Sequence, residues 1–263
     1  MISNLELALM GLLVGTLIGM TGVGGGVVMV PILVMVMRVP PSIAIGTDLL
    51  YASLTKWAGA LQHWQMQTVN FEIASFLLVG SLPSALVGTF LVKIIKEWGG
   101  GSAENILNRI LAGTLILVAA MMLTRIFVHR TNDRHPNVAA PSSRQRRRIW
   151  TVLLGAATGL VVGLTSIGAG SLVMVFLVIL YSAPAKQLVG TDLFHAAILA
   201  TVAALGHLFV GNADLRLAAW LSVGSIPGVI LGSRLSAWMP DNALRLLLAL
   251  ALFFSGVRLT GAI

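Results

Sequence analysis

Long apolar segments, separated by short polar connections, run through almost the whole chain. A helix needs about 20 mostly apolar residues to cross the hydrocarbon core of a bilayer, and several segments reach that length. Helices are expected because an open strand edge would leave backbone groups without hydrogen bonds in lipid. The pattern therefore predicts an all-α polytopic membrane protein. Its apolar segments fall into two sets of four, at 5–37, 41–64, 71–95 and 104–127, then at 150–181, 185–210, 215–238 and 241–262.

The second half of the chain repeats the first half at an offset of 144 residues. Over residues 11–92, 25 of 82 aligned pairs are identical without a gap. Shared hydrophobicity explains some leucine, valine and alanine matches, but not coincident aspartate, histidine, proline and glycine. Gly-Thr-Asp-Leu at 46–49 aligns with the same four residues at 190–193, and His63 aligns with His207. A match of this length indicates an internal duplication.

We divide the chain into a first transmembrane repeat (1–128), a basic linker (129–148) and a second transmembrane repeat (149–263). Duplicated halves are typical of secondary transporters, in which one repeat would move against the other. Three crossings in each half would invert the second repeat relative to the first, whereas four would leave the repeats parallel. We favour inversion, on the precedent of inverted-repeat transporters.

The first apolar segment, 5–37, is too long for one straight crossing. As a single helix it would extend about 50 Å, against a hydrocarbon core of about 30 Å. Its middle reads Thr-Gly-Val-Gly-Gly-Gly at 21–26, where a helix is least favoured. We predict two half-helices that meet at this break and fold as a re-entrant hairpin. The equivalent break of the second repeat is Thr-Ser-Ile-Gly-Ala-Gly at 165–170.

Composition supports a membrane protein, since only 10% of the residues are charged and a soluble domain usually has about 25%. The net charge is +8, and the stretch 125–148, with seven arginines and one aspartate, supplies +6 of it. Basic loops beside membrane spans mark the cytoplasmic side. We therefore expect a cytoplasmic linker that faces lipid, and no nucleic-acid partner. The absence of cysteine excludes disulfides and thiolate metal sites.

The two glycine-rich breaks are the candidate substrate site. A break frees backbone N–H groups at the start of the following half-helix, and these groups attract anions together with the helix dipole. We expect these half-helices to begin near Gly26 and Gly170. The alternative is that the glycines only let helices pack closely. The candidate substrate-binding residues are Thr21, Gly22, Gly24, Gly25, Gly26, Thr165, Ser166, Gly168, Gly170 and Lys56.

Lys56 is a charged residue of the first repeat whose counterpart in the second is Ala200. It would supply one fixed positive charge to an anion path, or extend to a lipid headgroup. Asp48 and Asp192 lie inside apolar segments, where carboxylates are costly and usually functional. An acid beside an anion site must be protonated or offset, which suits proton coupling. The alternative is a cap on a neighbouring helix end.

His63 and His207 follow these aspartates by fifteen residues, about 22 Å along one helix. Aspartate and histidine of the same helix therefore cannot share a contact, although inverted repeats would bring Asp48 level with His207. The alternative is a histidine at the membrane interface. The spacing lacks local metal-ligand character, and we expect neither a metal site nor a cofactor. The candidate coupling or gating residues are Thr47, Asp48, Thr191, Asp192, His63 and His207.

Two stretches and one histidine of the first repeat together resemble the sulfite exporter (TauE/SafE) family. They are Gly-Met-Thr-Gly-Val-Gly-Gly-Gly-Val-Val-Met-Val-Pro at 19–31, Gly-Thr-Asp-Leu-Leu-Tyr-Ala-Ser-Leu-Thr-Lys at 46–56, and His63. The second half is similar to that family's second repeat, with Gly206-His207 and Gly-Ser-Ile-Pro-Gly at 224–228. The resemblance implies a bacterial inner-membrane permease that exports sulfite, sulfoacetate or related sulfonates.

We interpret the chain as a secondary transporter of small anions held at the two breaks. Its expected partners are that anion and the lipid bilayer, and its glycine-faced helices would allow a homodimer. The alternatives are a passive anion channel and a divalent-metal permease that uses Asp48 and Asp192. An enzyme is not expected, because neither HExxH, GxSxG nor a pair of neighbouring carboxylates occurs.

Overall fold

The computed structural model describes residues 3–21, 25–131, 143–168, 170–181, 183–235 and 241–260. Every regular element in these ranges is helical. The α-helices are α1 (Asn4–Thr21), α2 (Gly25–Pro31), α3 (Pro41–Gln65), α4 (Phe71–Trp98), α5 (Ala103–Thr131), α6 (Arg144–Thr165), α7 (Ser171–Leu180), α8 (Ala185–Phe209), α9 (Leu215–Leu235) and α10 (Asp241–Leu259). A π-helix, Ile32–Val36, continues α2, and a short 3₁₀ turn, Gly100–Ser102, precedes α5.

Among the described residues, five helices are long and apolar enough to cross a bilayer: α4, α5, α6, α8 and α9. Shorter apolar helices accompany them in both halves. The central helix α3 has the same 25-residue length as α8 and, like it, one aspartate and one lysine, but its remaining residues are more polar. The prediction of an all-α polytopic membrane protein is confirmed.

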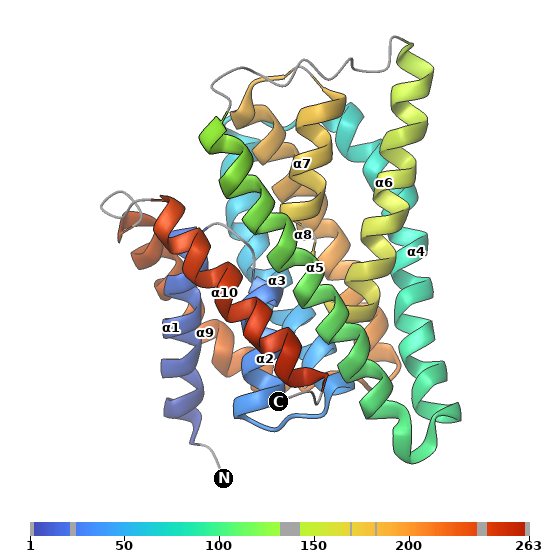
Figure 1. Ribbon diagram of the computed structural model, residues 1–263, viewed down its shortest axis with the longest axis vertical. Coiled ribbons are helices and arrows are strands. Elements are labelled where there is room, and N and C mark those ends of the chain that lie inside the picture. The colour runs from blue at the N-terminus through green and yellow to red at the C-terminus, as the bar shows by residue number, and fades with distance from the viewer. Residues whose placement is uncertain are drawn as a thin grey trace.

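Both predicted breaks interrupt the helices. The first separates α1, which ends at Thr21, from α2, which begins at Gly25; the second separates α6, ending at Thr165, from α7, beginning at Ser171. Figure 1 shows α1 extending from the N-terminal end to the middle of the molecule, after which α2 returns towards that end. In the same view α6 enters from the opposite end and α7 returns there.

Two glycine-lined seams join the outer helices of one half to those of the other. Gly11, Gly15 and Gly19 of α1 face successive turns of α9, and a Cβ added at any of them would lie within 2.5 Å of an α9 carbonyl oxygen. Gly155, Gly159 and Gly163 of α6 face α4 in the same way. The register advances in the same direction along both helices of each pair, so α1 is parallel to α9 and α6 to α4. The four-residue glycine spacing therefore serves close packing.

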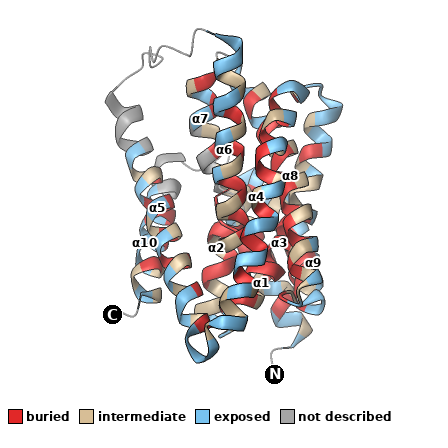
Figure 2. Ribbon diagram, turned by 90° about the vertical axis from the view of Figure 1, so that its right-hand side faces the viewer, coloured by how far each residue is buried: buried red, intermediate tan, exposed pale blue. Residues whose placement is uncertain are grey.

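The long helices α3 and α8 pack against each other at the centre of the molecule, where Figure 2 shows buried residues concentrated. Their contacts run antiparallel, since Gly46 faces His207 while Gly190 faces His63. The Trp57 indole N–H donates to the Thr201 hydroxyl at 2.9 Å, and these two residues are 144 positions apart. Trp57 and Thr201 are equivalent positions of the two repeats. Equivalent residues meet each other where a pseudo-two-fold axis relates the two halves, so this contact is what such an axis would give.

The helix pairs are reciprocal between the halves, because α1 with α9 corresponds to α6 with α4. This pairing supports the inverted duplication and the boundaries drawn from it, which stay predictions. The ends of the predicted linker are helical: α5 continues to Thr131 and α6 begins at Arg144. Residues 132–142 lie outside the described ranges.

Candidate functional site

The two breaks meet at one buried point. The Ser166 hydroxyl, at the break of the second half, donates a hydrogen bond of 2.5 Å to Oδ2 of Asp48, on α3 of the first half. Gly26, in the first turn of α2, lies against both residues. A Cβ at Gly26 would be 2.4 Å from the Ser166 carbonyl oxygen and 2.7 Å from Asp48 Oδ2. Residues 118 positions apart in sequence, Asp48 and Ser166, therefore form one contact.

The second break is shaped by two residues with positive φ. Ser166 ends α6 in the left-handed conformation at φ 61°, and Gly168 follows at φ 111°. Thr165 closes the turn, since its hydroxyl accepts from the Ile167 N–H at 3.2 Å. Gly170 then precedes α7 and no side chain caps that helix start. The first N–H groups of α7 are thus left for a ligand or water.

His207 fixes the end of α6 beside this break. It is fully buried, so it packs inside the protein and does not face lipid. Its Nε2 lies 2.8 Å from the carbonyl oxygen of Gly163, which has lost its usual helical donor because α6 ends two residues later. The histidine therefore acts as a side-chain cap for that carbonyl. Gly46 packs against the His207 Cβ, which brings Asp48 close to the level of His207.

Asp48 retains an unsatisfied acceptor. The carboxyl group is fully buried, and its Oδ1 has no hydrogen-bond partner among the described residues. Three residues further along α3, the buried Tyr51 hydroxyl interacts with that of Ser225 on α9, but neither oxygen reaches hydrogen-bonding geometry. Unpaired polar atoms at zero exposure are costly. A proton, a water or a ligand at this place would lower that cost.

Asp192 and His195 repeat this arrangement on α8. Asp192 is buried, and within the described part of the chain its Oδ1 is also unpaired. His195 stands where the first half has Tyr51, and its Nε2 lies 2.9 Å from the Ser81 hydroxyl of α4. The two halves therefore differ. The hydrogen bond from α8 to α4, between His195 and Ser81, is formed, whereas the equivalent one from α3 to α9, between Tyr51 and Ser225, is not.

Lys56 is within electrostatic range of both carboxyl groups. It is one residue before Trp57, which contacts Thr201 where the two central helices cross, and it interacts electrostatically with both Asp48 and Asp192. Its side chain is partly exposed. Two lysines beside a two-fold axis would repel each other, which gives a reason for Ala200 at the equivalent position. One cation here serves both acids.

Thr47 and Thr191 are turned away from the breaks and cap outer helices of the other half. The Thr47 hydroxyl accepts from the N–H of Asp214 at 3.0 Å, and Asp214 in turn caps α9. The Thr191 hydroxyl accepts from the N–H of Asn70, the cap of α4, at 2.9 Å. Within each Gly-Thr-Asp motif, the threonine therefore orders a helix start and the aspartate lies in the interior.

The remaining predicted residues lie apart from this contact or outside the described ranges. His63 is half-buried, with Nδ1 2.8 Å from the Thr68 hydroxyl at the end of α3. Gly25 is the first residue of α2 and Thr21 the last of α1. Gly22 and Gly24 lie outside the described residues. Within the described part of the chain, no three His, Asp or Glu side chains are close enough to hold a metal ion.

Sequence reasoning did not select Tyr51, His195, Ser81 or Ser225. Tyr51 and His195 each follow a motif aspartate by three residues, which places them on the same helix face. That spacing was the available signal. Their serine partners follow a glycine at equivalent positions, 81 and 225, on the outer helices.

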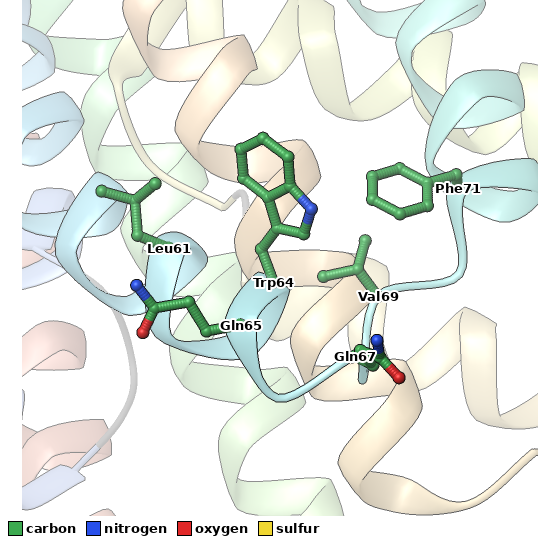
Figure 3. Close-up of a pocket in the computed structure, with 6 residues that line it drawn as sticks. All are labelled: Leu61, Trp64, Gln65, Gln67, Val69 and Phe71. Carbon is green, nitrogen blue, oxygen red and sulfur yellow. The ribbon is translucent and has the colours of Figure 1, made fainter.

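A larger cavity, of about 710 Å³, lies at the surface where α3 ends. Figure 3 shows Trp64, Phe71 and Leu61 around it. The Phe194 ring makes edge-to-face contacts with Trp57, Trp64 and Phe71, so these aromatic residues form a cluster beside the cavity. None of the predicted site residues lines it, and half-exposed Trp and Phe side chains are typical of a membrane interface.

Comparisons with known proteins agree with this architecture. The model of the sulfite exporter TauE/SafE family matches residues 7–259. The probable membrane transporter protein YjnA of Bacillus subtilis is 39% identical, over 97% of this chain and 99% of its own. The probable membrane transporter proteins YdhB and YunE of the same organism are 27% and 24% identical, each over at least 89% of both chains.

No solved structure matches the chain significantly. The family model covers both central helices and both breaks, and the first relative spans the chain almost from end to end. The chain therefore belongs to the sulfite exporter TauE/SafE family and is a multi-pass membrane transporter rather than an enzyme.

Proposed function

We propose that this protein is a secondary transporter that exports small sulfur-containing oxyanions or organosulfonates, such as sulfite, across a bacterial inner membrane. The family supports the substrate class. The observation that carries the proposal is the contact of Gly26, Asp48 and Ser166, which brings the break of each half to one buried place. In this proposal the anion binds there, between the starts of α2 and α7.

The helix starts supply the attraction. The first N–H groups of α2 and α7 have no helical acceptor, and both helix dipoles place partial positive charge near the breaks. At the α7 start the N-cap residue is Gly170, which has no side chain to compete for these groups. A tetrahedral or pyramidal oxyanion accepts several such bonds at once, which makes it the best-matched ligand.

Asp48 then couples binding to protonation. An ionised carboxylate beside the substrate would repel it, so the anion binds well only when Asp48 is protonated or offset by Lys56. When Asp48 is protonated on Oδ1, its Oδ2 can still accept the hydrogen bond from Ser166, while the Oδ1 hydroxyl becomes a donor. Asp192, in the equivalent place, would serve the second half.

The test is transport by the purified protein in liposomes, with sulfite, sulfate and sulfoacetate as substrates. Uptake of labelled substrate accelerated by unlabelled substrate on the other side identifies a carrier, whereas its absence identifies the channel alternative. Flux of Mn²⁺ or Zn²⁺ that is lost in both Asp48→Asn and Asp192→Asn would identify the metal permease instead. Absence of flux or binding for all three anions would reject the proposal.

The linker 129–148 lies on the cytoplasmic side in this proposal, on the basis of its arginines. The chain has no cysteine, so a single Gln145→Cys substitution at an exposed position provides a clean reporter. A membrane-impermeant maleimide should label it in inside-out vesicles and not in intact cells. Labelling of intact cells would reverse the orientation.

A further inference from the structure

A small polar cavity of about 170 Å³ lies among the first turns of α4 and α6 and the end of α7. It is far along the helices from the break contact, at the end of the molecule where α6 begins and α7 ends (Figure 1). Its lining includes Arg144, Arg147 and Arg148, together with Asn70, Glu72 and Tyr181. None of these residues belongs to the proposed transport site.

The cavity has an excess of positive charge. Its lining contains three guanidinium groups and one carboxylate, and Arg148 is paired with that carboxylate, Glu72, at 2.7 Å. Arg144 and Arg147 form no ion pair among the described residues and interact with Glu72 only at longer range. Two positive charges therefore face a cavity large enough for a phosphate-sized group, and guanidinium groups match phosphate oxygens in bidentate geometry.

Aromatic rings hold two of the three arginines, Arg147 and Arg148, in place. The Arg147 guanidinium lies 5.4 Å from the Tyr181 ring centroid, and that of Arg148 lies 5.0 Å from the Phe76 ring. Tyr181 is fixed in turn, because its hydroxyl lies 2.7 Å from the Thr151 hydroxyl on α6. Restricting the arginines before a ligand arrives reduces the entropy lost on binding.

The apolar surface beside the cavity indicates a lipid. In the turns of α6 that follow the arginines, Ile149, Trp150 and Leu153 are each about half exposed. This helix is one of the five that can cross a bilayer. The arginines at its start thus lie at headgroup level, and the exposed side chains below them lie where acyl chains would run.

We propose that this cavity binds the phosphate group of an anionic phospholipid, with Arg144 and Arg147 as its main contacts. A basic pocket between transmembrane helices, open to the headgroup region, is the general form of such a site. A soluble anion would gain the arginine contacts but not the neighbouring apolar surface. The phospholipid is therefore the occupant that uses both features.

Native mass spectrometry of the full-length protein in detergent provides the test, with titration of phosphatidylglycerol and, separately, phosphatidylcholine. The wild type should bind phosphatidylglycerol in preference to phosphatidylcholine. In the double variant Arg144→Gln/Arg147→Gln, the apparent Kd for phosphatidylglycerol should rise about 30-fold, since each arginine near a headgroup contributes about a fivefold change and the two factors multiply. The control Arg109→Gln/Arg258→Gln removes the same charge from helix ends on the opposite side, and its Kd should not change.

Three outcomes would overturn the proposal. Equal affinity of the wild type for both lipids would show that charge is not recognised. An equal loss in both double variants would show an effect of net charge alone. Inorganic phosphate that displaces phosphatidylglycerol at comparable concentration would show that the cavity takes a soluble anion. All of these results are independent of transport, so they separate this site from the proposed function.

Discussion

Gly26→Ala is the substitution that most directly tests the contact between the two breaks. The added Cβ would lie 2.4 Å from the Ser166 carbonyl oxygen, whereas ordinary contacts begin at 3.4 Å. One side must therefore move by about 1 Å, which separates α2 from the second break. Overpacking of this kind costs about 1–3 kcal/mol, which corresponds to a five- to hundredfold loss of transport if the site must assemble in each cycle.

The matched control is Gly113→Ala in α5, where no atom lies within 4 Å of the added Cβ. Alanine there should leave transport unchanged and raise the free energy of unfolding by about 0.5–1 kcal/mol, because it restricts the unfolded chain. The assay is the initial rate of sulfite uptake into liposomes, divided by the amount of correctly inserted protein. Thermal unfolding in detergent shows whether each variant is folded.

Equal uptake by the Gly26 and Gly113 variants, with both folded, would refute the reasoning. If the Gly26 variant does not fold, Ser166→Ala gives a second test without added volume. It removes the hydroxyl that bonds Asp48 and should lower the uptake rate while the protein still inserts. Normal uptake by this variant would exclude the contact from the transport cycle.

The other predictions concern single hydrogen bonds around the same region. Asp48→Asn should flatten the dependence of uptake on pH, measured between about pH 5 and 8, because an amide does not take up a proton in this range; a pH profile like that of the wild type would exclude Asp48 from coupling. His207→Ala leaves the Gly163 carbonyl unpaired and should lower the free energy of unfolding by about 1–3 kcal/mol, as measured by thermal or denaturant unfolding in detergent. Thr47→Val removes the acceptor for the Asp214 N–H and should reduce stability by about 0.5–2 kcal/mol, with uptake per folded molecule retained; a selective loss of uptake would instead indicate a gating role.

Local features of the sequence were enough to predict the helices and their interruptions. Three consecutive glycines at 24–26 and the Thr-Ser-Ile-Gly sequence at 165–168 disfavour helix; α2 begins at Gly25 within the first, and α6 ends at Thr165, where the second begins. Membrane spans can also be predicted locally, because the length of an apolar segment is enough to identify one. Long-range contacts were not accessible in this way. The hydrogen bond between Asp48 and Ser166 depends on how α3 packs against the other half.

The roles of individual polar residues were harder to predict for a related reason. Thr47 precedes Asp48, and sequence gives no means to tell which of the two side chains is directed to the interior. The packing decides it, because Thr47 meets the start of α9. Tyr51 and His195 were missed since an aromatic residue in an apolar helix resembles core packing until its partner on another helix is known.

The glycine seams restrict how this transporter can move. In α1 with α9 and in α4 with α6, backbones touch directly along several turns, so sliding or separating them would open a long void in lipid. The two members of each pair come from different halves of the chain. A transport cycle in which one half moves as a rigid body against the other would separate α1 from α9 and α4 from α6. The mobile units are therefore expected to be composite, each seam travelling as one rigid piece relative to the central helices.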